Sequence, residues 1–565
     1  MWRIPGLFLL CYYRRHRRFS LLCWLPTYPR NNTMVHDKQD EMGPVPDNSL
    51  NEGSQSMWNV LVEKKRLVGY ILFTTIAPVM FGFDNIIVGV VTSMPFFQVT
   101  FGQLSGETFI LPALWLGLWN AFVQIGIMAG AAANSIFIDK FGRRLGFVLG
   151  GVIGTAAVGA IYAADDMESL SGKRGVFLLG KTILGVSLGV LLSTSQTYVS
   201  EVAPTRLRGP LLASYTFFMA VGQIIAITLI FKRIAIFNVQ AFKVPFAAQW
   251  ALTGVAIIAG LVIPESPQFH LRRGDISNAK KSFARLNPGH DHDSQFAILQ
   301  AAYVHEVEAA QATGHDASIK DCFKGTDLRR TRIIVWVNLL QQLLGITLIA
   351  NGAYFLQLAG MSPVLSLTMS QIGVSLVLVA NVISWYTMTR FGRRFIMLAS
   401  TLVVSALWLS TGIAGCFKST AALWYIGVCI MVIGFCLQSG VGSAWPVVSA
   451  ETSSMRLRTQ SQAIAWVSNA FFSWLFNFFV PYLFDTDQAD LGGKIGFFFS
   501  GLCCFGFLII WFEIPEMKNR TYTELDELFA NKVATRKFES YVCDSGHAIA
   551  EIVVDLDKQH IEHKE

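Results

Sequence analysis

The sequence predicts an all-α membrane protein with twelve transmembrane helices, arranged as two pseudo-symmetric six-helix bundles with a cytosolic helical connector between them. Composition is the first reason: 53% of the 565 residues are hydrophobic and only 15% are charged, whereas about 25% of a soluble domain is charged. Apolar segments of about 20 residues, long enough to cross a bilayer core of about 30 Å, alternate with short polar loops. Two charged motifs also occur twice at one spacing.

The repeated motifs indicate an internal duplication. Asp139-Lys-Phe-Gly-Arg-Arg144 returns as Thr389-Arg-Phe-Gly-Arg-Arg394, and the segment 201–208 (EVAPTRLR) returns as 451–458 (ETSSMRLR). Both shifts are 250 residues, from 139 to 389 and from 201 to 451. Two unlike motifs that share one offset are explained most simply by two halves that carry them at equivalent places.

The N-terminal residues 1–66 are polar on balance, and we expect them to form a disordered cytosolic region. Their apolar stretch from Ile4 to Cys11 is too short to span a bilayer. The basic cluster from Arg14 to Arg18 follows this stretch, whereas a secretory signal carries its charges first. We therefore do not interpret the stretch as a secretory signal.

Twelve apolar segments follow and define the two bundles. They are 67–91, 113–138, 145–164, 175–200, 210–231, 246–263, 333–358, 364–388, 395–416, 421–449, 459–483 and 495–512. The predicted domains are an N-terminal bundle (67–263), a cytosolic connector (264–332), a C-terminal bundle (333–512) and a cytosolic tail (513–565).

The distribution of Lys and Arg predicts the orientation. The loops with the repeated motifs fall on one side, together with the connector and its basic patch at Arg329, Arg330 and Arg332. We expect this side to be the cytosol and to hold both termini. The opposite side carries fewer positive charges, which are Lys173, Arg174, Lys232, Arg233 and Lys243.

Two ionisable residues lie well inside the predicted spans: Asp84 in the first and Lys181 in the fourth. They lie about 17 and about 19 residues from the cytosolic ends of their helices, and so at about the same depth. We predict that they pair, because an isolated charge in a membrane is costly. Asp84 would take up and release a proton as its distance from Lys181 or its hydration changes. A static structural pair is the alternative. Nearby Pro78 and Gly82 predict local irregularity in this segment.

Polar side chains in three segments mark a predicted substrate cavity. They are Gln341, Gln342, Thr347 and Asn351 in the seventh segment, Thr216 and Gln223 in the fifth, and Asn469, Ser473 and Asn477 in the eleventh. Amides both donate and accept hydrogen bonds, which suits the hydroxyls of a neutral sugar or polyol. Hydrogen bonding between helices is the structural alternative. Phe81, Trp445 and Trp466 are candidates to stack on a sugar ring, and the scarcity of other charges argues against phosphates and carboxylates.

The repeated charged motifs lie at predicted cytosolic helix ends and form a candidate cytosolic gate. Its residues are Asp139, Arg143, Arg144, Glu201 and Arg208 in the first half, and Arg393, Arg394, Glu451 and Arg458 in the second. A two-fold arrangement predicts that Glu201 faces Arg393 and Arg394, and that Glu451 faces Arg143 and Arg144. Such pairs would latch the halves together in the outward-open state. The alternative is that these charges set topology and cap helices.

The sequence gives little indication of disulfides, of an enzyme or metal site, or of nucleic-acid binding. Nine cysteines make an odd count without a C-x-x-C pair, so we interpret them as packing residues. No nucleophile–base or metal-ligand constellation indicates an enzyme. Basic residues in short loops are typical of orientation signals and do not indicate nucleic-acid binding. We expect no cofactor, no metal and no nucleic-acid partner, and we expect a monomer in the lipid bilayer.

Taken together, the motifs resemble the sugar porter family of the major facilitator superfamily over about residues 67–540. They are Phe81-Gly-Phe-Asp84, Asp139-x-x-Gly-Arg-Arg144, Glu201-x-x-Pro-x-x-Leu-Arg-Gly209, Pro264-Glu-Ser-Pro267, Gln341-Gln342-x-x-Gly345, Phe391-Gly-Arg-Arg394 and Pro515-Glu-x-Lys-x-Arg-Thr521. The segment 521–529 and Ser384-Trp385 are similar to the fungal maltose/α-glucoside:proton symporter branch.

The resemblance implies the major facilitator fold and a function. The implied function is proton-coupled import of a neutral sugar, an α-glucoside such as maltose, across the plasma membrane by alternating access. A facilitative hexose or polyol carrier is the alternative, and a non-transporting sugar receptor is a further one.

The resemblance also assigns residues. Asp84 falls at the position of the coupling acid, and Lys181 falls where many members carry Arg. Gln223, Gln341 and Gln342 match sugar-contacting positions, and Asn469 falls where an amide is expected. Departures from the family pattern at Thr216, Thr347 and Pro446 leave the identity of the sugar open.

Overall fold

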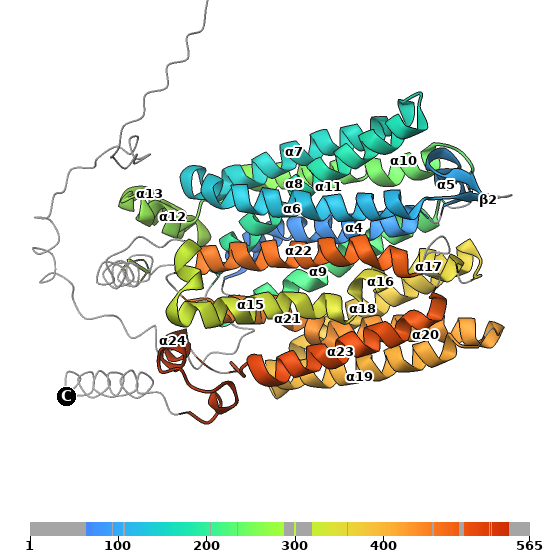
Figure 1. Cartoon of the computed structure of the whole chain (residues 1–565). Coiled ribbons are helices and arrows are strands. Elements are labelled where there is room, and N and C mark those ends of the chain that lie inside the picture. The colour runs from blue at the N-terminus through green and yellow to red at the C-terminus, as the bar shows by residue number, and fades with distance from the viewer. Residues whose placement is uncertain are drawn as a thin grey trace, which may run out of the picture. The chain divides into compact units, whose positions relative to one another are not determined.

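The described part of the chain is a bundle of long helices that run side by side (Figure 1). The computed structural model describes residues 64–541, with gaps at 93, 106–107, 204, 234–235, 288–295, 297–298, 301–318, 359, 418, 455–456, 485–490, 519 and 521. Nearly all of the region 1–66 and the end of the tail lie outside the described residues, so the predictions for them are not addressed by the structure.

The first half of the chain forms six long helical stretches. The helices are α3 (Lys65–Thr74), α4 (Ile76–Val91), α6 (Ala113–Phe141), α7 (Arg143–Ala163), α8 (Leu170–Val202), α9 (Thr205–Phe231), α10 (Gln240–Ala247) and α11 (Gln249–Val262). Helices α3 with α4, and α10 with α11, each form one stretch long and apolar enough to cross a membrane. Between α4 and α6 lie α5 (Pro95–Phe101) and an antiparallel hairpin of β1 (Gln103–Ser105) and β2 (Thr108–Ile110).

The second half repeats this organisation. Its helices are α15 (Gly325–Leu343), α16 (Ile346–Ala350), α17 (Gly352–Leu358), α18 (Pro363–Phe391), α19 (Arg393–Ala414), α20 (Thr420–Leu437), α21 (Ser443–Thr452), α22 (Arg458–Phe484) and α23 (Ile495–Glu513). A π-helical turn, η4 (Gln438–Gly442), joins α20 to α21. In both halves, long apolar helices confirm the predicted membrane class.

The seventh predicted segment is interrupted, whereas eleven other helical stretches among the described residues are long and apolar enough to cross a membrane. Its path is divided into α15, α16 and α17, which follow one another along the bundle (Figure 1). The first break is at Gly345, whose φ of 89° is left-handed and unfavourable for other residues. A Cβ there would lie 2.7 Å from the Trp408 ring, and Trp408 Nε1 donates to the carbonyl oxygen of Leu344 at 3.0 Å. Trp408 therefore provides a hydrogen bond to the backbone carbonyl group of Leu344, next to the break.

The irregularity predicted for the first segment is present at Thr75, where α3 ends and α4 begins, three residues before Pro78, which has no N–H to donate along the helix. At Gly82 the helix is unbroken, and this glycine instead allows α4 to pack closely on α9. A Cβ on Gly82 would lie 1.9 Å from the carbonyl oxygen of Met219, and a Cβ on Gly222 would lie 2.0 Å from that of Val79. Only glycine allows the two backbones to approach so closely.

The connector and the tail lie at the same end of the bundle (Figure 1). The connector contributes α12 (Pro267–Arg272), α13 (Ile276–Leu286) and η3 (Ile319–Phe323), and the tail contributes α24 (Tyr522–Ala530) and η6 (Thr535–Lys537). Arg330 in the predicted basic patch forms an ion pair with Asp526 at 2.6 Å, and its guanidinium lies 4.4 Å from the centre of the Phe529 ring. The basic patch is therefore a docking site for the tail of the same chain.

At the other end, three of the positive charges on the predicted non-cytosolic side have partners within the protein, and two of these partners are acidic side chains. Lys173 pairs with Asp165 at 3.2 Å, and Lys243 pairs with Asp166 at 3.0 Å. The Arg174 guanidinium is buried and donates to the carbonyl oxygen of Phe101 at 2.7 Å. These charges therefore have local structural partners.

Helices of the two halves pack directly on one another. Helix α6 packs on α22, and α9 packs on α18. The domain boundaries at 67–263, 264–332, 333–512 and 513–565 stay predictions, but these contacts bring side chains of both halves to one central cavity.

Candidate functional site

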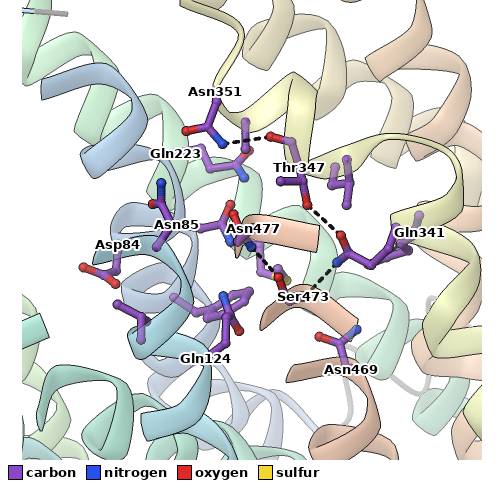
Figure 2. A pocket seen from close by; sticks show the side chains of 18 of the residues that line it. Asp84, Asn85, Gln124, Gln223, Gln341, Thr347, Asn351, Asn469, Ser473 and Asn477 are labelled. Carbon is purple, nitrogen blue, oxygen red and sulfur yellow. Dashed lines mark hydrogen bonds between the residues drawn. The ribbon is translucent and has the colours of Figure 1, made fainter. Parts of the chain in front are cut away.

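A cavity lies between the two halves of the chain. It encloses about 1020 Å³ of space, its open mouth included, and is lined by residues of α4, α6, α8 and α9 and of α15, α16, α18, η4, α21 and α22. Ten of the described lining residues carry side-chain amides: Asn85, Asn120, Gln124, Gln223, Gln341, Gln342, Asn351, Gln438, Asn469 and Asn477. Several of these converge in Figure 2. The cavity is therefore rich in neutral groups that donate and accept hydrogen bonds.

The interrupted seventh segment supplies an ordered part of this lining. Gln342 Nε2 donates to Ser473 Oγ at 2.7 Å, and Gln342 Oε1 accepts from Thr347 Oγ1 at 2.7 Å. Asn351 Nδ2 donates to the carbonyl oxygen of Thr347 at 2.9 Å. Because both ends of the Gln342 amide are held, its orientation is fixed before any ligand enters.

The other predicted cavity residues also reach this space. Gln223 from α9, Gln341 from α15, and the predicted stripe of Asn469, Ser473 and Asn477 on α22 all line it. Gln341 Nε2 donates to the carbonyl oxygen of Gly442 at 3.4 Å, a long contact that leaves the amide less firmly held than Gln342. Thr216 also lines the cavity, and it donates to Asn381 Oδ1 at 2.7 Å across the two halves.

Aromatic rings form one wall of the cavity. Phe81 and Trp445 line it directly, and Trp466 packs against both, with ring centres 6.5 Å and 5.5 Å away. Trp466 Nε1 also donates to Gln196 Oε1 in the first half. Two of the three aromatic candidates are thus placed to contact a ligand, whereas Trp466 supports them from behind.

Asp84 and Lys181 are the two charged residues in the described cavity lining. The Lys181 ammonium donates to Asp84 Oδ1, so the two residues pair as predicted. Their exposed fractions are 3% and 0%. An ion pair that is buried in the wall of a cavity is a candidate for coupling proton movement to ligand binding.

Gln249, at the start of α11, completes this buried group, and sequence reasoning missed it. Its Nε2 donates to Asp84 Oδ1 at 3.3 Å, and its Oε1 has no hydrogen-bond partner among the described residues. Gln249 is neutral, so charge does not distinguish it from the rest of its segment. The available signal was an amide in the apolar sixth segment, since a buried amide needs partners.

The charged helix ends are organised within each half. Arg143 pairs with Glu201 at 2.6 Å, and Arg393 pairs with Glu451 at 2.8 Å. The predicted pairing across the halves is therefore wrong for this structure. Each arginine pairs with a carboxylate at a helix end of its own half, because this carboxylate is nearer than those of the other half.

Glu265 and Glu516, which follow Pro264 and Pro515, hold the N-terminal ends of α7 and α19, the helices that begin at Arg143 and Arg393. The Glu265 carboxylate accepts the backbone N–H groups of Arg143 and Arg144 at 2.9 and 3.1 Å. Glu516 does the same for Arg393 and Arg394, at 3.0 Å each. A carboxylate at a helix N-terminus satisfies free N–H groups and complements the helix dipole.

The remaining residues of the candidate gate surround these two ion pairs. Arg144 donates to the carbonyl oxygen of Leu261 at 2.8 Å, and Arg394 donates to that of Trp511 at 2.8 Å. Asp139 lies 3.7 Å from Arg143 and is half exposed. The side chains of Arg208 and Arg458 lie outside the described residues.

Comparison with known proteins identifies the family. The model of the family described as "Sugar (and other) transporter" matches residues 70–529. The chain belongs to this sugar transporter family. As a member of the major facilitator superfamily and a multi-pass membrane protein, this sugar transporter moves solutes, and its family and fold do not indicate an enzyme.

Individual relatives resemble this sugar transporter over most of its length. The "MFS transporter fmqE" of Aspergillus fumigatus is 29% identical, over 83% of this chain and 87% of its own. The "General alpha-glucoside permease" of Saccharomyces cerevisiae is 26% identical, over 91% and 83%. The structure of the proton:xylose symporter XylE of E. coli matches with a TM-score of 0.68 and 20% identity, over 83% of this chain and all of that one. This last likeness shows the major facilitator fold.

Proposed function

We propose that this sugar transporter is a proton-coupled symporter that imports a neutral sugar, an α-glucoside such as maltose, by alternating access. The observation that carries the proposal is the position of the Asp84–Lys181 pair on the wall of the amide-lined cavity. A proton site and a sugar site that share one space can influence each other directly.

Three features support a neutral sugar as the ligand. The amides supply donors and acceptors for hydroxyl groups, and Phe81 and Trp445 supply apolar faces for a sugar ring. Apart from the paired Asp84 and Lys181, the described lining carries no charge that would select an anion or a cation. The relatives named as α-glucoside permeases favour that sugar class.

The coupling step follows from the contacts of Asp84. As a carboxylate it accepts hydrogen bonds from Lys181 and Gln249. When a proton binds, the carboxyl group loses its charge and its attraction to Lys181 weakens. The Gln249 amide suits both states, because its NH₂ donates to a carboxylate and, after rotation, its oxygen accepts from a carboxylic acid. We propose that sugar binds this protonated state from outside and that release of both ligands inside resets the carrier.

At the candidate cytosolic gate, we propose that the charged helix ends act within each half. The pairs Arg143–Glu201 and Arg393–Glu451 each tie helix ends within one half. They would keep each half rigid while the halves rock against each other. The Lys and Arg distribution favours both termini in the cytosol, and the proposed role in sugar import favours the plasma membrane.

Replacement of Asp84 by Asn tests the proposal. Asp84→Asn keeps the shape of the side chain but cannot bind and release a proton near neutral pH. We expect uphill sugar accumulation to be lost while exchange of labelled for unlabelled sugar is retained. Asp275→Asn is the control, because Asp275 caps α13 in the connector and Asn is an equally good cap. Accumulation that survives in Asp84→Asn would contradict coupling through Asp84 and favour the facilitative carrier.

A further inference from the structure

A second cavity adjoins the amide-lined one. It encloses about 780 Å³, its open side included, and lies among residues of α4, α9, α16, α17, α18 and α20. The two cavities share six lining residues: Asn85, Gln223, Ile346, Ala350, Val377 and Gln438. Because they share these six residues, the two cavities border each other.

The second cavity differs from the first in chemistry. Its twelve remaining lining residues are Ile86, Ile349, Gly352, Leu356, Met369, Ser370, Gly373, Val374, Gly427, Ile430, Met431 and Gly434. Ser370 is the one residue among these twelve with a polar side chain. We name these twelve residues the apolar annex.

The glycines of the apolar annex leave its space open. A Cβ on Gly352, Gly373, Gly427 or Gly434 would meet its nearest atom at 3.4 Å or more, which is ordinary contact. By comparison, a Cβ on Gly126 or Gly130 would lie 2.3 or 2.2 Å from the backbone of α8. Close packing of helices therefore requires glycine at Gly126 and Gly130, but it does not require glycine in the annex.

We propose that the substrate is a glucoside with an apolar aglycone, an aryl or short alkyl group, which occupies the apolar annex while the sugar ring occupies the amide-lined cavity. This inference rests on the proposed function, and within the α-glucosides it ranks those with an apolar aglycone above maltose. A second sugar ring in the annex would lose water from its hydroxyls and gain few hydrogen bonds. An aryl group there would instead remove apolar surface from water on both sides. Gln223 and Gln438 mark the boundary between the two parts of the site.

A comparison of glucosides in the full-length carrier tests this assignment. The probes are labelled methyl, phenyl and 4-nitrophenyl α-D-glucosides and maltose, offered to cells that lack their own sugar carriers. We expect KM to fall by about tenfold or more from the methyl to the phenyl compounds, because burial of an added apolar group favours binding. Maltose should bind more weakly than 4-nitrophenyl α-D-glucoside.

Two variants test whether the aglycone binds in the apolar annex. Gly434→Leu and Gly373→Leu place a side chain in the annex, so KM for the aryl glucosides should rise to about that of the methyl glucoside, and it should rise far more than KM for the methyl glucoside does. The control is Gly501→Leu, at an exposed glycine of α23 with no atom within 4 Å of an added Cβ. Surface labelling checks that each variant reaches the membrane. If the annex variants do not, the series of aglycones on the unmodified carrier decides.

The outcomes separate this inference from the function on which it rests. Equal KM values for the methyl and aryl glucosides, or maltose taken up with the lowest KM, would overturn the annex assignment and leave the sugar carrier intact. Uptake of none of the sugars in cells that display the protein would overturn both. Aryl selectivity that Gly434→Leu and Gly373→Leu leave unchanged would also overturn the assignment to the annex.

Discussion

Gln223 and Gln342 illustrate two kinds of cavity residue. The Gln342 amide is held at both ends by Ser473 and Thr347, and its side chain is buried. Gln223 lies in the same lining and forms no hydrogen bond with another described residue. Loss of Gln223 should therefore remove a ligand contact alone, whereas loss of Gln342 also leaves buried protein groups unpaired.

Substitution of Gln223 and of Gln342 should therefore affect sugar binding and stability differently. Gln223→Ala should raise KM for the sugar about tenfold or more with little change in melting temperature, because it removes one directed hydrogen bond to a hydroxyl. Gln342→Ala should raise KM and also lower the melting temperature. Uptake kinetics and thermal denaturation of the purified carrier measure the two effects. An unchanged KM in Gln223→Ala would exclude that side chain from the binding site.

At this scale, the sequence identified residues better than it identified their partners. Asp84 and Lys181 stood out because isolated charges are rare in apolar segments, and their depth predicted that they pair. Glu265 and Glu516 were visible as parts of motifs, yet their role depends on backbone N–H groups more than 120 residues away. Such contacts follow from tertiary structure, which spacing along the chain does not encode.

The interrupted helix is the central feature at the scale of elements. The breaks at Gly345 and Asn351 divide the seventh segment and bring Gln342, Thr347 and Asn351 into one hydrogen-bonded group. Irregular backbone inside a membrane is tolerated where it lines a cavity or is buried in protein. Both conditions hold here, because the segment borders the cavity and Trp408 packs against the break.

Gly345→Ala tests the importance of this break. A Cβ at a φ of 89°, and 2.7 Å from the Trp408 ring, should reduce the free energy of unfolding by about 1–3 kcal/mol. Gly434→Ala is the matched control, because its Cβ would lie 3.6 Å or more from other atoms. Thermal denaturation of both variants checks the prediction. Equal melting temperatures would show that the break does not require glycine.

Hydropathy predicted the existence of the helices well but not their interruptions. The segment from 333 to 358 is as apolar as a continuous span would be, so composition does not reveal the left-handed residue within it. The helix ends also extend beyond their predicted limits, as α8 does from Leu170 to Val202. Polar residues in these extra turns pair with groups on other helices, which the sequence alone does not show.

For the whole molecule, the docked tail links distant parts of the chain. Arg330 at the start of α15 contacts Asp526 and Phe529, and Arg329 Nη1 donates to the carbonyl oxygen of Val533 at 2.7 Å. Leu525, Leu528 and Phe529 are buried with the core of the bundle. The tail therefore contributes to the stability of the second half.

Arg330→Ala should lower the free energy of unfolding by about 1–3 kcal/mol, because Arg330 is buried and its loss removes an ion pair and an aromatic contact. Arg332→Ala should change it by less than about 1 kcal/mol, because the Arg332–Glu513 pair at 2.9 Å is more exposed. Melting temperatures of the two variants test the contrast. An equal loss in both would contradict a specific docking role for Arg330.

Proton coupling involves the whole molecule, because it joins the proton site at Asp84 to movement of sugar across the membrane. The direct measurement is external pH during sugar addition to cells that lack their own sugar carriers and display this protein. We predict external alkalinisation on addition of the transported α-glucoside, and none with Asp84→Asn. Uptake of labelled sugar without any pH change would contradict proton coupling and leave Asp84 and Lys181 as a structural ion pair.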